Sequence, residues 1–150
     1  MRKNEVAADI IIQDQKIIDS DIENIAGARH WAAQHAEVAG FDKDAVFAIE
    51  LAVGEAVTNI IRHAYDNQPG HEIHLSLTID DTKFSLRILD FGRKFDPANE
   101  PLPNLDTPRE GGYGIFLMKK VMDEVTYDTT TLPQGTQLDL IKYRTTTAKD

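Results

Sequence analysis

Residues 49–65, IELAVGEAVTNIIRHAY, present two different faces at helical spacing. At about 100° per residue, their apolar side chains fall on one stripe, which we expect to be buried. Almost opposite lie three polar side chains, Glu55, Asn59 and Arg62. Such a face usually meets only water, but small residues such as Gly54 surround it, so a bulky ligand can approach. A carboxylate and an amide four residues apart can also share one small target, such as a hydrated metal ion.

Outward from this helix, the hydrophobic pattern predicts an α+β fold. The helix itself should span 43–65 with Asp42 as its N-cap. The helix before it should begin at Ser20 and Asp21, with Glu23 completing a capping box. The expected order is a strand at 9–13, helices at 21–39 and 43–65, a hairpin at 71–80 and 82–90, a helix at 111–123 and a hairpin at 124–131 and 136–144. This order is typical of helices that cover one face of a largely antiparallel sheet.

The composition limits the possible functions. The 150 residues are 41% hydrophobic and 27% charged, which predicts one globular domain over residues 1–150. With 16 Lys and Arg against 25 Asp and Glu, the net charge of −9 argues against direct nucleic-acid binding, which needs a basic face. The absence of cysteine excludes disulfides, thiolate nucleophiles and Cys-ligated zinc. We find no signal-peptide-like or membrane-spanning apolar run, so we expect a cytoplasmic protein that binds no membrane.

Two glycine-containing clusters follow the first hairpin. The DFG motif at 90–92 stands where a strand should end, but no HRD-type loop or VAIK lysine of a eukaryotic-type protein kinase accompanies it. The run GGYG at 111–114 precedes a helix, whose free N–H groups suit a phosphate. It is not a Walker A loop, because no GK[ST] follows, and the GxGxxG pattern fails at Leu117. Either cluster alone is more often a simple turn.

The combination and order of these motifs resemble the GHKL ATP-binding fold, also called the Bergerat fold. Four boxes match in order: Glu55-x-x-x-Asn59, Asp90-x-Gly92 with Phe95-Asp96-Pro97, Gly112-x-Gly114, and Gly135-Thr136. Within that fold, the sequence most resembles the small bacterial anti-sigma factor serine/threonine-protein kinases of the RsbW and SpoIIAB type, over about residues 10–143. The resemblance implies a two-layer sandwich of a mixed, mostly antiparallel sheet with helices on one face.

The resemblance also implies a role for each motif residue. Glu55 would be the catalytic general base for an acceptor serine, and Asn59 would bind Mg²⁺ through its amide oxygen. Asp90 would accept a hydrogen bond from the adenine amino group of ATP. Residues 95–111 would be the ATP lid. The residues expected to bind the nucleotide are Asn59, Arg62, Asp90, Gly92, Phe95, Arg109, Gly111, Gly112, Tyr113, Gly114 and Thr136.

The lid departs from this family in one respect. Relatives have an arginine immediately before the glycines, whereas Glu110 stands there in this sequence and Arg109 lies one residue earlier. A flexible lid can still deliver Arg109 to the terminal phosphate, and Arg93 or Lys94 can substitute for it. The departure concerns the rate of phosphoryl transfer more than nucleotide binding.

The leading functional hypothesis is a partner-switching regulator that uses ATP and Mg²⁺. It would phosphorylate a serine on a STAS-domain anti-anti-sigma factor, and would bind a sigma factor or other target protein once that antagonist is phosphorylated. The resemblance also implies a homodimer. One alternative, suggested by Glu110, is an ATP-binding sequestering module without significant kinase activity. Another is a histidine-kinase-type catalytic domain, which needs a helical segment with a phosphoacceptor histidine that we do not find ahead of the ATP fold.

Overall fold

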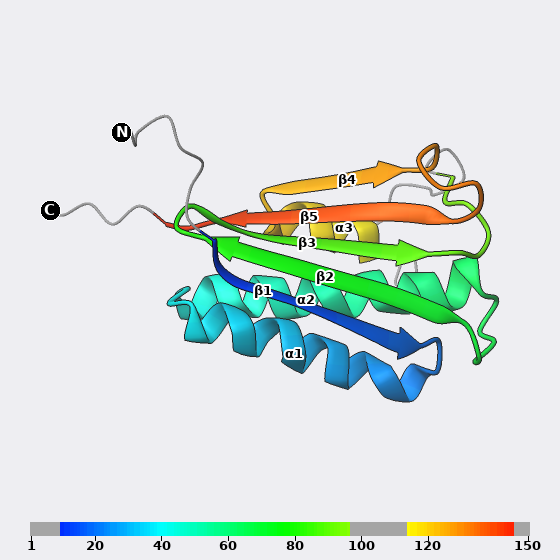
Figure 1. Ribbon diagram of the computed structural model, residues 1–150, viewed down its shortest axis with the longest axis horizontal. Helices are drawn as coiled ribbons and strands as arrows, with labels where there is room; N and C mark the ends of the chain where they lie inside the picture. The colour runs from blue at the N-terminus through cyan, green and yellow to red at the C-terminus, as the bar shows by residue number, and fades with distance from the viewer. Residues whose placement is uncertain (1–9, 97–113, 146–150) are drawn as a thin grey trace, which may run out of the picture.

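The described part of the chain forms one five-stranded sheet with helices on a single face (Figure 1). The computed structural model describes residues 10–96 and 114–145. Its elements are β1 (Ile10–Asp19), the 3₁₀ turn η1 (Ile22–Asn24), α1 (Ile25–Val38), α2 (Lys43–Asn59), the π-helix η2 (Ile60–Ala64), β2 (Glu72–Asp80), β3 (Lys83–Asp90), α3 (Gly114–Val121), β4 (Glu124–Asp128) and β5 (Thr136–Tyr143).

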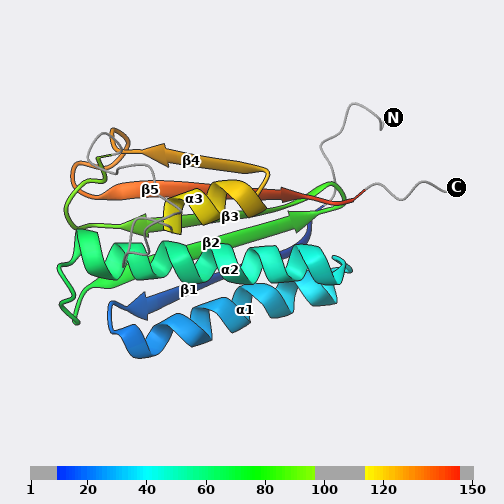
Figure 2. The same ribbon diagram turned by 180° about the vertical axis from the view of Figure 1, so that it is seen from behind.

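The strand order is β1-β2-β3-β5-β4, and every pairing among the described residues is antiparallel. Figure 2 shows the sheet from behind, with α1, α2 and α3 lying over the same face. The predicted α+β sandwich is therefore confirmed. Its sheet is antiparallel throughout the described residues, rather than mixed.

The first strand, β1, extends well beyond the apolar run at 9–13 that predicted it. It pairs with β2 along its length, although polar residues take some of the positions that face α1. Asp14 is one of these, because its carboxylate accepts a hydrogen bond from Trp31 Nε1 at 3.0 Å and pairs with His35 Nε2 at 2.8 Å. The hydrogen bonds with His35 and Trp31 hold the pKa of Asp14 below its ordinary value. Because side chains of α1 satisfy the hydrogen-bonding capacity of Asp14, this polar residue can face the helix. It thereby interrupts the alternation of apolar and polar residues by which a strand is recognised.

The first helix begins differently from the predicted capping box. Asp21 is the N-cap of the 3₁₀ turn η1, since its carboxylate accepts a hydrogen bond from Glu23 N at 2.9 Å, and Asn24 is at the N-cap position of α1 without a side-chain cap bond. The Ser20 hydroxyl instead donates to the Gln68 carbonyl at 2.7 Å and accepts from His71 N at 3.1 Å. The buried Ser20 side chain therefore connects the end of β1 to the loop before β2 through hydrogen bonds. Because these partners are distant in the sequence, local spacing does not reveal the contact.

The predicted helix at 43–65 divides into two parts. α2 begins at the expected N-cap, Asp42, and ends at Asn59. The next turn, η2, is a π-helix, in which Tyr65 N donates to the Ile60 carbonyl five residues earlier at 3.1 Å. Single π-turns at the end of an α-helix occur frequently at functional sites.

The hydrophobic core lies between the sheet and α2. Ile49, Val53 and Val57, on the apolar stripe of α2, are fully buried, as their spacing predicts. Burial of each such side chain contributes roughly 1.5–3 kcal/mol, so the stripe holds α2 in one orientation on the sheet. Fully buried strand residues complete the core: Ile73, Leu75, Leu77, Ile79, Phe84, Leu86, Ile88 and Leu140. Among residues 10–96 and 114–145, no helix combines the length and apolar character that a membrane span requires.

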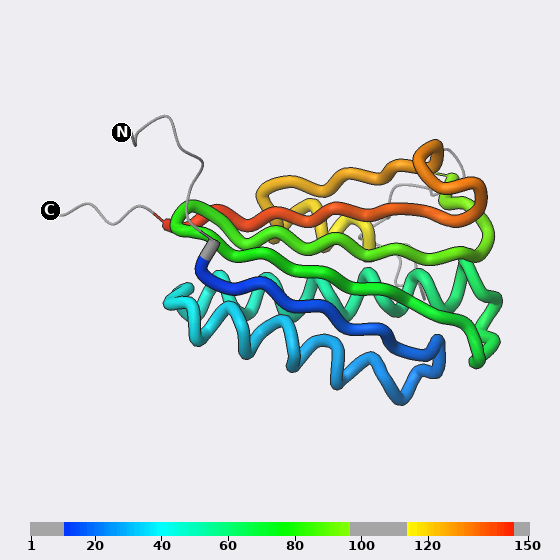
Figure 3. The backbone as a smooth tube through the Cα atoms, viewed as in Figure 1, coloured from blue at the N-terminus to red at the C-terminus, as the bar shows by residue number. Residues whose placement is uncertain are grey.

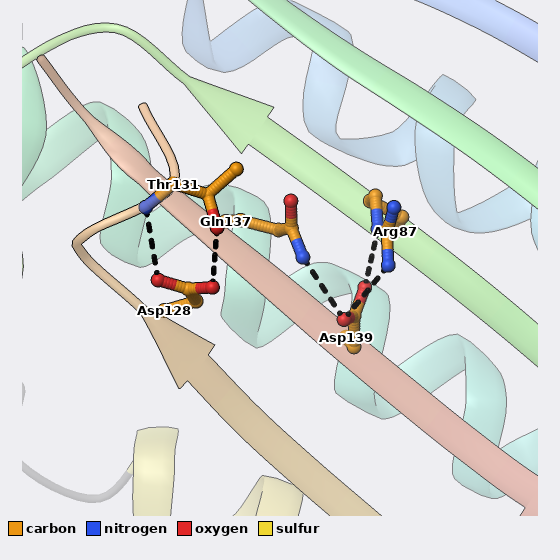
Figure 4. Close-up of polar contacts among 5 residues, drawn as sticks. All are labelled: Arg87, Asp128, Thr131, Gln137 and Asp139. Atoms are coloured by element: carbon orange, nitrogen blue, oxygen red, sulfur yellow. Dashed lines mark hydrogen bonds and ion pairs between the residues drawn. The ribbon is translucent and has the colours of Figure 1, made fainter. Parts of the chain in front are cut away.

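The other face of the sheet is uncovered by the described helices, and Figure 4 shows polar contacts between side chains of β3 and β5 on it. Arg87 on β3 forms a two-point ion pair with Asp139 on β5, with Nε–Oδ1 and Nη2–Oδ2 distances of 2.8 and 3.2 Å. The Gln137 side chain also donates to Asp139. An exposed pair of this kind contributes about 0–1 kcal/mol, so the buried face, rather than this one, stabilises the sheet.

Three connections meet at one end of the sheet. The tube in Figure 3 shows that the end of η2, the turn after β3 and the loop from β4 to β5 gather at the end opposite the β2–β3 hairpin turn. Segments that are far apart in the sequence therefore lie side by side there, and the candidate site is found among them.

Candidate functional site

A cavity of about 300 Å³ opens at this end, between η2, the turn after β3 and the strands β4 and β5. Cavities of this volume accommodate small-molecule ligands. Five residues predicted to bind nucleotide line it: Asn59, Arg62, Asp90, Phe95 and Thr136. Other residues that line it include His63, Ala64, Ile115, Tyr127 and Leu138.

Asp90 lies at the buried side of the cavity, where only 3% of its surface is exposed. One carboxylate oxygen accepts a hydrogen bond from Gly92 N at 3.0 Å, and the backbone of Thr136 also donates to the carboxylate. Burial nevertheless dominates and raises the pKa of Asp90 to about 6, against these hydrogen bonds and the positive charge of Lys94. A buried acceptor of this kind suits a ligand that presents a hydrogen-bond donor, such as an amino group on a ring.

Replacing Asp90 should change how stability depends on pH. Because its folded-state pKa of about 6 lies above the ordinary 3.8, the carboxyl contributes stability that is fully present below pH 3.8 and lost as the pH rises through 6. Asp90→Asn removes this titration, so the wild type should lose roughly 1–2 kcal/mol relative to the variant between pH 5 and pH 8. Urea unfolding of both proteins at the two pH values measures the difference. If the free energies of unfolding of wild type and Asp90→Asn differed by the same amount at pH 5 and pH 8, the pKa of Asp90 would not be raised.

The turn after Asp90 packs tightly against the end of η2. A Cβ atom on Gly92 would lie 2.3 Å from the Ala64 carbonyl oxygen and 2.8 Å from the Tyr65 ring. Arg93 N donates to the same Ala64 carbonyl at 2.9 Å. On this side of the site the backbone of the turn after β3 therefore packs directly against the backbone of η2, and only glycine fits at position 92.

Tyr65 supports the same turn from behind. Its hydroxyl donates to the Glu72 carbonyl at 2.7 Å and accepts from Phe91 N at 2.8 Å. Burial is the main cause that raises the pKa of Tyr65, so the hydroxyl keeps its proton and can donate at neutral pH.

Tyr65→Phe should destabilise the protein by about 1–3 kcal/mol, because it leaves a partly buried carbonyl and a partly buried N–H without their partner. Tyr143→Phe is the matched control, since the Tyr143 hydroxyl bonds the exposed carboxylate of Glu124 and should be nearly dispensable. Urea unfolding measures both variants. Equal stability losses would mean that Tyr65 has no special role at this turn.

The polar face of α2 meets the start of α3. A Cβ atom on Gly114 would lie 2.9 Å from Glu55 Oε1 and 3.2 Å from Asn59 Nδ2. Both side chains are half-buried, and Asn59 also lines the cavity, whereas Glu55 lies beside Gly114 and is not one of the lining residues. A helix start offers N–H groups and the positive end of the helix dipole. A carboxylate, an amide and an anion-favouring helix start are thus brought together.

The segment after Gly92 is held against β4 and β5. Phe95 N donates to the buried Thr136 hydroxyl at 2.9 Å, and the Phe95 ring stacks on Tyr127 with ring centroids 4.0 Å apart. The stacked rings provide an apolar side to a cavity that otherwise contains many polar groups.

The two cations proposed as substitutes for the lid arginine have partners within the protein. Arg93 forms an ion pair with Asp66. Lys94 Nζ donates to backbone carbonyls of the loop between β4 and β5. Both residues also line the cavity, so the substitution stays a prediction. Some predicted residues lie outside the described part of the chain, namely Arg109, Gly111, Gly112, Tyr113 and the expected lid apart from Phe95 and Asp96.

The donor set fits a magnesium ion that arrives with phosphates. Among the residues that the structure describes, no group of three or more His, Asp and Glu side chains could hold a metal. Magnesium usually keeps several waters and takes few protein oxygens besides those of substrate phosphates. The amide oxygen of Asn59, beside the helix start at Gly114, suits that mode of binding.

Sequence reasoning missed two aromatic residues of the site. Tyr127 lies opposite Leu138 in the predicted hairpin of β4 and β5, but it reaches the cavity only because β5 also pairs with β3, which brings it to Asp90 and Phe95. Tyr65 did have a signal, since it is an aromatic residue at the end of the helix motif. Its two hydrogen bonds, however, reach β2 and the turn after β3.

The sequence is similar to those of known proteins. Residues 18–142 match the histidine kinase-like ATPase domain family. Similar curated proteins include the serine-protein kinase RsbW of Staphylococcus epidermidis, 37% identical over 115 residues and 70% of each chain. The Oceanobacillus iheyensis RsbW is 32% identical over 114 residues, which are 69% of this chain and 70% of that one.

A solved structure shows the same fold. The crystal structure of the RsbU and RsbW domains of a Mycobacterium tuberculosis protein matches with a TM-score of 0.67 at 16% identity, over 92% of this chain and 34% of that one. Together with the sequence matches, the chain therefore belongs to the histidine kinase-like ATPase domain family and, within it, to the RsbW serine-protein kinases.

Proposed function

We propose that this protein is an ATP-dependent anti-sigma regulator in a partner-switching pathway. It phosphorylates a serine of a STAS-domain anti-anti-sigma factor and sequesters a sigma factor or a similar target, acting in the cytoplasm as a homodimer. The observation that supports this best is the meeting of Glu55 and Asn59 with Gly114, beside a cavity that has the buried carboxylate of Asp90 at its far side. The serine-kinase names of the relatives support the reaction class.

The cavity residues fit a purine nucleotide. Asp90 offers a buried acceptor to the amino group of adenine, and the tight turn at Gly92 keeps side-chain atoms out of the base site. The stacked rings of Phe95 and Tyr127 give an apolar side to the same space. Backbone N–H groups near Gly114 would receive phosphate oxygens, as helix N-termini commonly do.

The catalytic roles follow from the polar face of α2. When bound, ATP supplies the phosphoryl group and Mg²⁺ neutralises phosphate charge. Asn59 would hold the ion through its amide oxygen, and Arg62 lies one turn further along on the cavity. Glu55 takes the proton from the acceptor serine hydroxyl, as a general base. The segment 95–111 is proposed to close over the nucleotide and exclude water.

A phosphorylation assay tests the proposal. The protein is incubated with ATP, Mg²⁺ and a STAS-domain protein from the same organism, and phosphate-affinity gels with mass spectrometry locate any phosphoserine. We expect Mg²⁺-dependent phosphoserine on the partner. ATP binding without phosphoserine would contradict the kinase role and favour a sequestering module, the alternative that Glu110 suggests.

A further inference from the structure

Lys94 makes three contacts with one loop. Its Nζ donates to the carbonyls of Thr129 at 2.6 Å, Leu132 at 2.9 Å and Gly135 at 3.1 Å. All three carbonyls belong to residues 129–135, which join β4 to β5. An ammonium group has three N–H donors, so these contacts use its full donor capacity. The side chain therefore ties the turn after β3 to this loop.

The beginning of the same loop has a separate anchor, shown in Figure 4. The Asp128 carboxylate accepts hydrogen bonds from Thr130 N at 2.8 Å, from Thr131 N at 3.1 Å and from the Thr131 hydroxyl at 2.5 Å. The hydrogen bonds from Thr131 and Thr130 hold the pKa of Asp128 far below its usual range. Asp128 organises the first residues of the loop, and Lys94 binds carbonyls at its beginning, middle and end.

The end of the loop forms part of the cavity. Gly135 has a φ of +99°, and a Cβ atom there would lie 1.9 Å from the Asp90 carbonyl oxygen. The next residue, Thr136, lines the cavity, donates from its backbone to the Asp90 carboxylate and accepts from Phe95 N. A displacement of this loop would therefore move the groups that hold Asp90.

We propose that Lys94 is a positioning residue for nucleotide binding, because its ammonium group holds residues 129–135 where Gly135 and Thr136 support Asp90. This inference rests on the proposed function, since it assumes that the cavity binds ATP. The same ammonium group brings a positive charge close to Asp90 and lowers the pKa of that carboxyl. Removal of Lys94 should therefore alter both the shape and the protonation of the base site.

Other titratable or charged side chains lie around Asp90 on neighbouring segments. They are Arg62, His63, Tyr65, Asp66, Arg93 and Asp96. Every variant compared below retains all six, so differences in pH dependence between the variants arise from Lys94.

The experiment compares Lys94→Met with Lys94→Arg and with Lys142→Met. Lys142 is the matched control because its Nζ also donates to a backbone carbonyl, that of Val121 at 2.8 Å, but at the far end of α3. Calorimetry should show ATP affinity about tenfold weaker for Lys94→Met and near wild type for Lys142→Met. The kcat at saturating ATP should stay unchanged. The pH below which ATP binding is lost should rise in Lys94→Met and return toward the wild-type value in Lys94→Arg.

Two results would overturn this inference while leaving the proposed function intact. One is a Lys94→Met protein with wild-type ATP affinity and pH midpoint, and the other is an equal loss of affinity in Lys142→Met. A wild-type protein that binds no ATP would instead overturn the proposed function. Should Lys94→Met not fold, Lys94→Gln, which keeps two N–H donors without the charge, must raise the pH midpoint; an unchanged midpoint contradicts the inference.

Discussion

Glu55→Gln is expected to lower the rate of serine phosphorylation by about 10²- to 10⁴-fold, the usual contribution of a general base. The amide has nearly the same shape as the carboxylate but cannot take the serine proton. Because Glu55 lies beside Gly114 and is not a lining residue of the cavity, ATP affinity should stay close to wild type. Initial rates of phosphoserine formation and calorimetric titration with ATP measure the two quantities separately.

Glu50→Gln is the control for this experiment. Glu50 lies on the same helix, and its carboxylate makes only a partly exposed contact with Arg29 at 3.7 Å. Both rate and ATP affinity should be retained in this variant. A Glu55→Gln protein that phosphorylates serine at the wild-type rate would exclude Glu55 as the base. Equal losses of rate and affinity would assign it to nucleotide binding instead.

Gly92→Ala should abolish measurable ATP binding and destabilise the fold by about 3 kcal/mol or more. Its Cβ would lie 2.3 Å from the Ala64 carbonyl oxygen and 2.7 Å from the Ala64 carbonyl carbon, and backbone atoms cannot move aside as a flexible side chain can. The turn after β3 must therefore separate from η2, which displaces Asp90 and its hydrogen bond from position 92. Thermal unfolding and ATP titration measure the two effects.

The matched control is Gly27→Ala on α1. No atom lies within 4 Å of a Cβ atom placed on Gly27, and its position is exposed and helical. Alanine should therefore raise stability by up to about 1 kcal/mol, the ordinary preference of a helix for alanine over glycine. If Gly92→Ala bound ATP as tightly as wild type, the close packing of Gly92 against η2 would not be needed for ATP binding. This conclusion would hold whatever the effect of Gly27→Ala.

The types of the elements could be predicted because hydrophobic periodicity is local. The residues of β2 and β3 alternate between buried and half-exposed positions, so their pattern identifies them as strands. β1 was underestimated because Asp14 is satisfied by Trp31 and His35 on another element. The π-helix at the end of α2 was also not predicted, since no residue in 60–64 interrupts the helical pattern.

The sequence predicted several residues of the candidate site, but not how they lie relative to one another. The spacing of Glu55 and Asn59 placed them on one polar face, and the structure adds that this face meets Gly114. The suggestion that Lys94 can substitute for a lid arginine stays a prediction, and the structure adds the contacts that Lys94 makes within the protein. Its three carbonyl partners belong to a loop about 40 residues away, so sequence proximity to Gly92 was a poor guide to its contacts.

The α+β class, the two faces of α2 and the order of the glycine motifs can be inferred from the sequence, because each depends on residues only a few positions apart. The burial that raises the pKa of Asp90 to about 6 and the contacts of Lys94 with the loop at 129–135 are visible only in the folded protein. Desolvation and the contacts between β3, β4 and β5 require that strands distant in the chain are first assembled into one sheet.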